Sequence, residues 1–480
     1  MRNAVLALLV ASAVAGQAGS ASAEPAPAAA RAVATTQAEI DRLAAWVDRE
    51  KGELSARFVE VETGRVIAEK NPALPLNPAS NAKVVTAAAV LARLGADHRF
   101  KSGLYGEVTG GVVARLVLRS NGDPSLSSRD LEKLVKVLSD ASIKRVGEIL
   151  VDQSAFDPRF VPPAFEQQPG EWAPFRAPVS AVSVDRNAFV VRVAPGRSGE
   201  PARVSVDPAG FVDIEGKIVT EQKGKGKSLR VEMRPKGSAL AIRLSGHIAA
   251  DAKATAFAKR VDDPRLYAGY VLRAMLKRRG VAVDGGVSEG GNGETHLLAE
   301  KSSEPVSVLL REVGKHSDNF TAETLLKALG AATSRRPGSS ADGAAAVSEW
   351  MKSAGALDSS TRIVNGSGLF DANRISAASL VAAQIAASKE PKTGSAFVDQ
   401  LAVGGVDGTL RNRFRSKSLR RKLRGKTGTL ARAHSLSGVV LGDDGRPRLA
   451  FALIINGIGT KADEQRRRID RVVEKAAAER

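Results

Sequence analysis

The sequence predicts an α/β (α+β) fold, in which one domain built from both ends of the chain is interrupted by an inserted β-rich region. The amino-terminal end has the pattern helix, β-hairpin, helix, and the carboxyl-terminal end has three strands followed by a helix. Between them, residues 100–261 carry short β-runs separated by Gly and Pro. A chain of 480 residues also exceeds one ordinary core, which favours two or three domains.

Residues 1–23 have the layout of a secretory signal peptide. Arg2 precedes an apolar run from residue 4 to about residue 15, and the small residues at 21–23 provide a cleavage site after Ala23. The apolar run is too short to cross about 30 Å of hydrocarbon. We therefore expect an exported periplasmic protein, soluble or peripherally associated with the envelope, without a membrane segment after cleavage.

The main domain is expected to begin at residues 24–99, after an Ala/Pro linker at 24–34. Apolar residues at helical spacing predict two helices, and alternating residues across Thr63-Gly64 predict a hairpin between them. The expected elements are a helix at 37–51, strands at 54–62 and 66–71, and a helix at 80–94.

The inserted region, residues 100–261, is expected to form two small β-rich domains, the inner one at about 189–237. Its β-runs lie at 112–118, 149–152, 189–193, 204–206 and 239–244.

Residues 262–480 are expected to complete the main domain. Asp444-Gly445 predicts the turn between its last two strands. The expected helices lie at 263–279, 306–313, 320–329 and 461–479, and the strands at 423–430, 435–441 and 448–455.

Composition excludes several classes of site. The chain has no cysteine, so disulfides, thiolate catalysis and cysteine-based metal sites are excluded. Its five histidines are scattered without an H-E-x-x-H pair, and we expect no metal. Aromatic residues make up only 4%, which argues against nucleic-acid binding by stacking. Loss of Arg2 with the signal peptide lowers the formal net charge from +19 to +18, which favours attraction to an anionic cell wall.

Ser80-Asn81-Ala82-Lys83 is an S-x-x-K motif at the start of a predicted helix. Residues three apart share a helix face, so the Lys83 amine can reach the Ser80 hydroxyl. A serine needs such a base to become nucleophilic, and the helix start stabilises developing negative charge. Alone, however, the motif also fits a capping serine beside a solvated lysine.

Two further motifs follow in the chain. Ser317-Asp318-Asn319 lies between two predicted helices, and Lys426-Thr427-Gly428-Thr429 lies on a strand of the terminal sheet. Each alone fits an ordinary cap or strand. Together, in this order and on these elements, the three motifs resemble those of the serine penicillin-recognising enzymes.

Within that class the chain most resembles the D-alanyl-D-alanine carboxypeptidase/endopeptidase family, peptidase S13, of the penicillin-binding protein 4 type. The resemblance runs from about residue 47 to the terminal helix, and four further segments support it, at 121–126, 177–187, 365–369 and 405–410. It implies a serine β-lactamase/transpeptidase-like domain with an insertion between Ser80 and Ser317. It also implies action on peptidoglycan stem peptides and crosslinks, acylation by β-lactams, and no cofactor.

The resemblance implies a role for each motif residue. Ser80 attacks the carbonyl between two D-alanines, Lys83 accepts its proton, and Ser317 relays a proton to the leaving D-alanine. For Lys83 to act at neutral pH, its pKa must fall from about 10.4 to roughly 7–8. The other expected substrate-binding residues are Asn319, which would hold the substrate amide, Lys426, Thr427 and Thr429, which would bind the terminal carboxylate, and Gly428 between them. The backbone N–H groups of Ser80 and Thr429 would form an oxyanion hole.

Some residues depart from the family pattern. Asn365 stands where the family has Asp, and Phe370-Asp371 where it often has Ser-Arg, which bears on the pocket for the stem peptide. Asp123, Asp407 and Ser367 fit buried structural roles better than substrate contacts.

Two other functions share part of this pattern. A serine β-lactamase would share the three motifs, but the chain has no E-x-x-L-N pentapeptide to speed hydrolysis of the acyl-enzyme. A non-catalytic wall-binding protein would need no nucleophile, so the presence of Ser80, Lys83 and Ser317 together argues against that function. The sequence does not define the oligomeric state.

Overall fold

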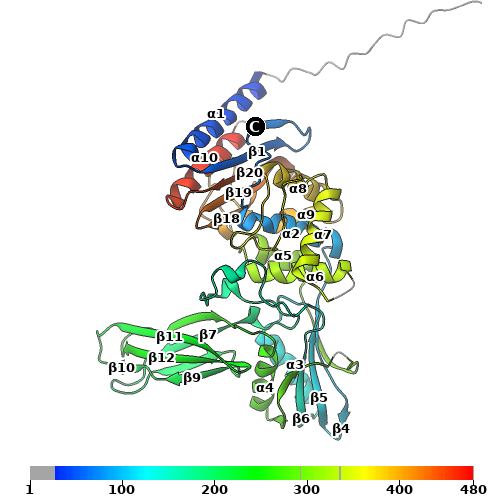
Figure 1. Cartoon of the computed structure of the whole chain (residues 1–480), viewed down its shortest axis with the longest axis vertical. Coiled ribbons are helices and arrows are strands. Elements are labelled where there is room, and N and C mark those ends of the chain that lie inside the picture. Colours follow the sequence, from blue (N-terminus) through cyan, green and yellow to red (C-terminus); the bar gives the residue numbers. More distant parts are fainter. Residues whose placement is uncertain (1–26, 292, 335–336, 479–480) are drawn as a thin grey trace, which may run out of the picture.

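The computed structural model describes residues 27–291, 293–334 and 337–478, so the expected signal peptide lies outside the described residues. The two ends of the described chain lie together at one end of an elongated molecule, and the insertion occupies the other (Figure 1). The prediction of a mixed α/β domain formed by both chain ends is confirmed.

The main domain is built on a six-stranded antiparallel sheet with the order β17-β18-β19-β20-β1-β2. The pairing of β20 with β1 joins the two ends of the chain, with Leu54 opposite Ile455. The strands are β1 (Glu53–Glu60), β2 (Val66–Lys70), β17 (Ala402–Val403), β18 (Leu423–Leu430), β19 (Ala433–Leu441) and β20 (Pro447–Asn456).

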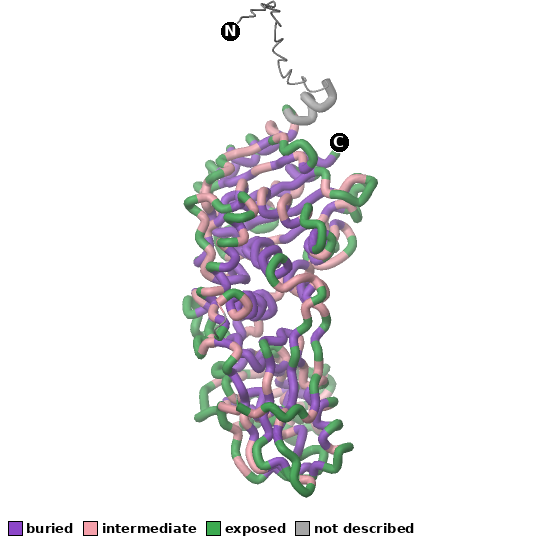
Figure 2. Tube along the Cα trace, turned by 90° about the vertical axis from the view of Figure 1, so that its right-hand side faces the viewer, coloured by how far each residue is buried: buried purple, intermediate pink, exposed green. Residues whose placement is uncertain are grey.

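Helices cover both faces of this sheet, because its central strands are apolar on both sides. In β20, Phe451 and Leu453 pack with α1 and α10, whereas Ala450 and Ala452 pack with the helices of the opposite face. Buried residues run through these central elements and again through the insertion (Figure 2). The helices are α1 (Pro27–Arg49) and α10 (Ala462–Ala478) on one face, and α2 (Ala82–Leu94), α5 (Val306–Gly314), α6 (Asn319–Ser334), α7 (Ser340–Ser353), α8 (Ala377–Lys389) and α9 (Gly394–Asp399) on the other.

Helix α1 begins earlier than expected. The sequence predicted a linker at 24–34, but the helix already starts at Pro27. Proline is tolerated in the first turn, where its missing N–H is not needed, and the alanines that follow have the highest helix propensity.

The insertion contains a seven-stranded sheet with the order β14-β6-β5-β3-β16, to which β4 and β15 are attached. Strands β14, β15 and β16 follow residue 261, where the sequence placed the end of the insertion, yet they pair with β6 and β3. The insertion therefore extends to Ser302. The strands are β3 (Lys101–Tyr105), β4 (Val108–Thr109), β5 (Val112–Ser120), β6 (Arg145–Asp152), β14 (Ala282–Val283), β15 (Val287–Glu289) and β16 (Leu297–Ser302).

Two helices pack on this sheet. Helix α4 (Tyr267–Arg278) corresponds to the helix predicted at 263–279, but it belongs to the core of the insertion. Helix α3 (Ser128–Asp140) was not predicted, although Ser127 and Asp130 form a capping box and Leu131, Leu134 and Leu138 are buried. Short β-runs on either side had masked this helical spacing.

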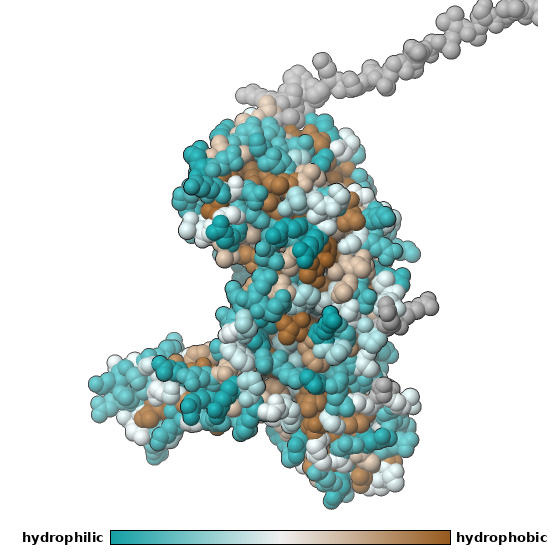
Figure 3. Space-filling model, viewed as in Figure 1, coloured by the Kyte–Doolittle hydropathy of each residue, from teal (hydrophilic) through white to brown (hydrophobic). Residues whose placement is uncertain are grey.

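The remaining strands form an arm that projects sideways from the molecule and is covered mostly by hydrophilic side chains (Figures 1 and 3). It comprises a three-stranded and a four-stranded sheet spanning 188–260, longer than the inner domain expected at about 189–237. The strands are β7 (Ala188–Ala194), β8 (Arg203–Asp207), β9 (Val212–Gly216), β10 (Val219–Glu221), β11 (Lys227–Lys236), β12 (Ala239–Ala249) and β13 (Thr255–Arg260).

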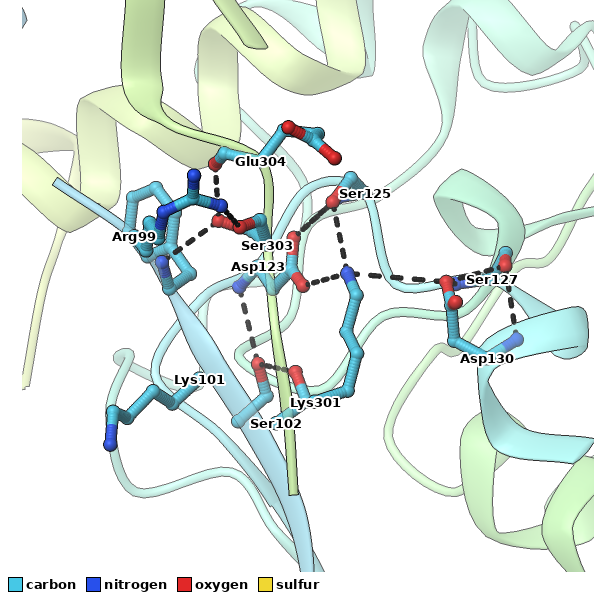
Figure 4. A network of polar contacts seen from close by, with 12 residues as sticks. Arg99, Lys101, Ser102, Asp123, Ser125, Ser127, Asp130, Lys301, Ser303 and Glu304 are labelled. Atoms are coloured by element: carbon cyan, nitrogen blue, oxygen red, sulfur yellow. Dashed lines mark hydrogen bonds and ion pairs between the residues drawn. The ribbon is translucent and has the colours of Figure 1, made fainter. Parts of the chain in front are cut away.

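A polar network ties together the two chain segments that enter and leave the insertion (Figure 4). Lys301 Nζ lies 2.6 Å from the fully buried carboxylate of Asp123 and 3.2 Å from Ser125 Oγ. Ser303 Oγ accepts the backbone N–H of Phe100. Asp123 thus has a structural partner, in agreement with the structural reading of this residue.

Candidate active site

Ser80 lies in a single 3₁₀ turn, Ala79–Asn81, immediately before α2. Lys83, in the first turn of α2, is buried and its Nζ lies 3.1 Å from Ser80 Oγ. The same amine donates to Asn319 Oδ1 and to the backbone carbonyl of Ser367, both at 2.7 Å. A neutral amine has two N–H groups for these acceptors, which leaves its lone pair for the Ser80 hydroxyl.

Burial lowers the pKa of the Lys83 amine to about 7, against the carboxylates of Glu323 and Asp318, which raise it. Desolvation disfavours the ammonium form, because an ion loses more hydration than a neutral amine. A substantial fraction of Lys83 is therefore neutral near pH 7, the state in which it can accept a proton.

A second lysine and serine face the same space. Lys426 Nζ, on β18, donates to Ser317 Oγ at 2.8 Å and to the carbonyl of Thr427 at 2.7 Å. Burial and the nearby Lys83 hold the pKa of Lys426 well below its usual range. Ser317 adopts φ +59°, in the left-handed region, which turns its backbone between α5 and α6.

Gly428 sets the close approach of β18 to Ser80. A Cβ at this position would lie 2.2 Å from Ser435 Oγ and 2.9 Å from the carbonyl of Pro78. The absent side chain lets the strand lie against the 3₁₀ turn that carries Ser80. Thr427 Oγ1 donates to Thr409 Oγ1 at 2.9 Å, so the strand is also tied to the segment that follows β17.

A cavity of about 740 Å³ opens above Ser80. Ser317, Asn319 and Thr429 line it near Ser80. At this size it can take a peptide end, since ligand sites commonly span about 300–1,000 Å³. The remaining lining is mixed, with apolar residues such as Phe175, Leu369 and Leu430. The polar lining residues include Asn77, Gln167, Gln168, Asp371, Arg374 and Arg432.

The insertion contributes one wall of this cavity. Asn319 Nδ2 donates to the carbonyl of Phe175, and Gln167 exchanges two hydrogen bonds with the backbone of Asp371. Both polar ends of Asn319 are thus engaged, one by Lys83 and one by Phe175. The sequence had assigned Asn319 to the substrate amide, whereas here it links the lysine to the insertion.

The two residues that depart from the family motif, Asn365 and Asp371, have defined contacts in the structure. Asn365 is fully buried and bonds to the carbonyls of Pro163 and Leu369 and to the N–H of Gly368, so its amide shapes the loop behind Lys83. Asp371 is exposed at the cavity and pairs with Arg374 at 2.6 Å.

Asp407 and Ser367, for which structural roles were expected, also have partners within the protein. Asp407 pairs with Lys315 at 2.6 Å. Ser367 is fully buried, and its hydroxyl accepts the N–H of Leu369.

Sequence reasoning missed Glu323. Its buried carboxylate accepts the N–H groups of Gly366 and Ser367, at 3.1 and 2.8 Å, and so holds the loop whose carbonyl binds Lys83. Burial raises the pKa of Glu323, while these hydrogen bonds and Lys83 oppose the rise. Other polar residues, such as Lys327, lie on the same helix, so the position of Glu323 in the sequence did not single it out.

Arg186 was also missed. It reaches from the insertion to Asp318, at 3.2 Å, and to Glu312, at 2.9 Å. This contact joins the turn of Ser317 to the insertion, and no local sequence pattern indicates it.

Across the described ranges, no group of three or more His, Asp or Glu side chains is placed to hold a metal ion. The helices described contain none that is long and apolar enough to cross a bilayer.

Comparison with known proteins identifies the family whose sequences this chain matches. A model of the D-Ala-D-Ala carboxypeptidase 3 (S13) family matches residues 36–478. A D-alanyl-D-alanine carboxypeptidase from Actinomadura sp. (strain R39) is 32% identical over 428 residues, which cover 83% of this chain and 77% of that protein.

Two solved structures share the fold. Penicillin binding protein 4 (dacB) from Haemophilus influenzae has a TM-score of 0.75 at 23% identity, covering 90% of this chain and 98% of that one. Bd3459, described as a predatory peptidoglycan endopeptidase from Bdellovibrio bacteriovorus, has a TM-score of 0.53 at 15% identity, covering 89% and 93%. The family match over nearly the whole described chain, together with the 32% identical relative, shows that this chain belongs to the D-Ala-D-Ala carboxypeptidase 3 (S13) family.

Proposed function

We propose that Ser80 is the nucleophile with which this D-alanyl-D-alanine carboxypeptidase and endopeptidase cleaves peptidoglycan stem peptides and crosslinks. One observation carries the assignment: the buried amine of Lys83, with a pKa of about 7, lies 3.1 Å from the hydroxyl of Ser80. A serine within hydrogen-bond reach of a neutral amine, in a cavity open to a peptide, has what acyl transfer requires.

In the first step, Lys83 accepts the proton of Ser80 as Oγ attacks the carbonyl carbon of the penultimate D-alanine. Carboxamide cleavage then breaks the C–N bond and leaves an ester on Ser80. The departing amine needs a proton, and it would receive the one that Lys83 took from Ser80. Ser317, whose hydroxyl accepts from Lys426 at 2.8 Å, is the hydroxyl that would relay it. Water then attacks the ester carbonyl and gives a proton to Lys83, which returns it to the Ser80 oxygen as the ester bond breaks.

The carboxylate of the terminal residue needs cationic or hydroxyl partners. Thr427 and Thr429 lie on β18 next to Ser80 and offer hydroxyl groups. Lys426 is fully buried and directed at Ser317, so we assign it an electrostatic contribution to carboxylate binding rather than a direct contact. The same arrangement suits a crosslink, whose leaving amine also carries a neighbouring carboxylate.

We also propose that the protein is exported to the periplasm. The signal-like residues 1–23 would deliver the protein to the periplasm, and the formal charge of +18 that remains would favour an anionic wall. Amino-terminal sequencing of protein from the envelope fraction should give Glu24 as the first residue. A mature protein that begins at Met1 would overturn this localisation.

The nucleophile is tested by intact mass spectrometry after exposure to benzylpenicillin. The wild type should gain one penicilloyl group that persists for many minutes, because β-lactams acylate the same serine and the chain has no E-x-x-L-N loop to speed hydrolysis. Ser80→Ala should gain none, and Ser353→Ala, an exposed serine on α7, should label like the wild type. Labelling that survives Ser80→Ala would refute the assignment, and rapid turnover of penicillin would favour a β-lactamase.

A further inference from the structure

The segment between β17 and β18 carries an unusual charge pattern. Residues 411–424 read R-N-R-F-R-S-K-S-L-R-R-K-L-R, with eight basic residues and no acidic one. We call residues 411–424 the basic ridge. In the whole chain, 71 basic residues face 52 acidic ones, so the ridge concentrates positive charge far beyond the average.

The ridge has a fixed shape. Phe414, Leu419 and Leu423 are buried in the core between the sheet and helices α1 and α10. The N–H of Arg421 donates to the carbonyl of Gly404, which ties the ridge to the end of β17. These apolar anchors are spaced so that the basic side chains between them point outward.

Among the described residues, most of this charge is not neutralised by an ion pair. Within the described residues, only Arg413 and Lys422 of the ridge form ion pairs, with Asp470 and Asp443. Five other basic residues are exposed and pair with no described carboxylate: Arg411, Arg415, Lys417, Arg420 and Arg421. Their mutual repulsion destabilises the folded chain and would be relieved by an external anion.

The ridge lies beside the active site. Arg411 is two residues from Thr409, whose hydroxyl accepts from Thr427 on β18. The N–H of Thr409 also donates to the carbonyl of Lys315, two residues before Ser317. The amino end of the ridge therefore begins next to a segment that contacts β18 and the residue two positions before Ser317. Its charge acts through an electrostatic field that falls off over about 8 Å at physiological salt.

We propose that the basic ridge is a docking surface for the peptidoglycan polymer, which it holds through the free carboxylates of stem peptides next to the one being cleaved. This inference rests on the proposed function, because it takes peptidoglycan as the substrate. A soluble stem peptide needs only the cavity, whereas the polymer presents repeated carboxylates to several cations at once. The ridge thus favours polymeric over soluble substrate.

The test measures binding without catalysis. Sacculi stripped of phosphate polymers with hydrofluoric acid are sedimented with protein in the Ser80→Ala background. The ridge variant is R415Q/K417Q/R420Q/R421Q, and the matched control is K217Q/K223Q/K225Q/K253Q on the arm, which removes the same charge. At low salt the ridge variant should bind about 10-fold more weakly than the control, and the difference should vanish near 1 M salt, where screening extends only about 3 Å.

Activity is measured separately with Ser80 intact. Both variants should take up benzylpenicillin and release D-alanine from a soluble pentapeptide within about twofold of the wild type, because neither set of residues contacts the reacting atoms. Equal binding of the ridge and control variants to stripped sacculi would overturn the proposal. Binding only to sacculi that keep their phosphate polymers would assign the ridge to phosphate instead. If the wild type released no D-alanine, the proposed function would be refuted. The sedimentation experiment would still decide whether the ridge binds sacculi, because it does not depend on catalysis.

Discussion

Two buried lysine amines in this site each lie within hydrogen-bond distance of a serine hydroxyl. Lys83 lies against Ser80, and Lys426 lies against Ser317. Burial lowers the pKa of both lysines, because a charged ammonium loses hydration that the protein only partly replaces. The chemistry of the site therefore depends on desolvation as much as on which residues are present.

Replacement of Lys83 by alanine should slow acylation of Ser80 by about 10²–10⁴-fold, the usual contribution of a positioned base. The fold should persist, because the Glu323 carboxylate near Lys83 keeps the hydrogen bonds from the N–H groups of Gly366 and Ser367. Stopped-flow acylation by a chromogenic cephalosporin measures the effect, with Lys352→Ala, in the last turn of α7, as control. An unimpaired Lys83→Ala would refute the base assignment.

The acylation rate of the wild type should rise with pH through about 7 and then level off. The sign follows from the chemistry, because only the neutral amine accepts a proton and the neutral fraction grows as pH passes the pKa. Rates measured from pH 5 to 9 give the curve. A flat profile across pH 7 would show that Lys83 does not titrate in the reacting enzyme.

Lys426 should act differently from Lys83. Lys426→Ala should chiefly weaken capture of substrate and penicillin, and it should leave Ser317 without its donor. The expected signature is a loss in kcat/KM larger than the loss in the limiting acylation rate. Equal losses in both quantities would make Lys426 part of the proton transfer instead.

At the scale of elements, one face of α6 supports the site. Asn319, Glu323 and Lys327 follow at intervals of four residues, and they bond respectively to Lys83, to the loop at 366–367 and to the carboxylate of Asp157. The helix thus connects the Lys83 amine to the loop behind it and to the insertion. Glu323 does not line the cavity, so we assign it a positioning role through Lys83.

Glu323→Gln should shift the rising limb of the acylation profile to lower pH, because loss of a carboxylate that raises the Lys83 pKa lets the amine become neutral earlier. Its maximal rate should also fall, since an amide cannot accept both loop N–H groups. The same measurement on Glu349→Gln, an exposed residue of α7, provides the control. A lower rate with no pH shift would mean that Glu323 has only a structural role.

Substitution of Gly428 tests whether the site requires the close approach of β18 to Ser80. Gly428→Ala would place a methyl group 2.2 Å from Ser435 Oγ, so the strand must move from Ser80. We expect slower acylation and a loss of about 1–3 kcal/mol in the free energy of unfolding, as for other overpacked sites. Gly286→Ala, where the added carbon meets no atom within 4 Å, should leave both quantities near wild type.

At the scale of the whole molecule, the network of Figure 4 joins the chain segments that enter and leave the insertion. Lys301→Ala would strand the buried Asp123 carboxylate, and such a loss commonly costs about 3–5 kcal/mol. Lys101→Ala, which removes a surface pair with Glu300, should cost under about 1 kcal/mol. Thermal and urea unfolding of the two variants would distinguish them, and equal stabilities would contradict the structural role of the network.

The cavity, walled on one side by the insertion, should also admit crosslinked substrate. Purified muropeptide dimers incubated with the wild type should be cut to monomers, and Ser80→Ala should leave them intact. Dimers that stay whole while pentapeptide monomers lose D-alanine would remove the endopeptidase activity and keep the carboxypeptidase one. Asp371 and Arg374 pair with each other at the cavity, so no strong preference for one diamino acid is expected.

Local patterns were sufficient for many elements of the main domain, but helices α7, α8 and α9 and strand β17 were not predicted. The apolar runs of β19 and β20 and the helical spacing in α10 are set by neighbours a few residues apart, and the structure keeps them. The three motifs likewise depend on short spacings, which is why Ser80, Lys83, Ser317 and Lys426 could be named from sequence. The family resemblance then implied that they meet, and the fold brings them together.

Contacts between distant segments were decided only by the tertiary structure. The pairing of β14–β16 with strands more than a hundred residues earlier moved the end of the insertion beyond residue 261. Glu323, Arg186 and the second partner of Asn319 became visible only once the chain had folded around them. Burial works in the same way: a lysine has one pKa in water, and only the packing of several remote elements around Lys83 removes that water and lowers its pKa to about 7.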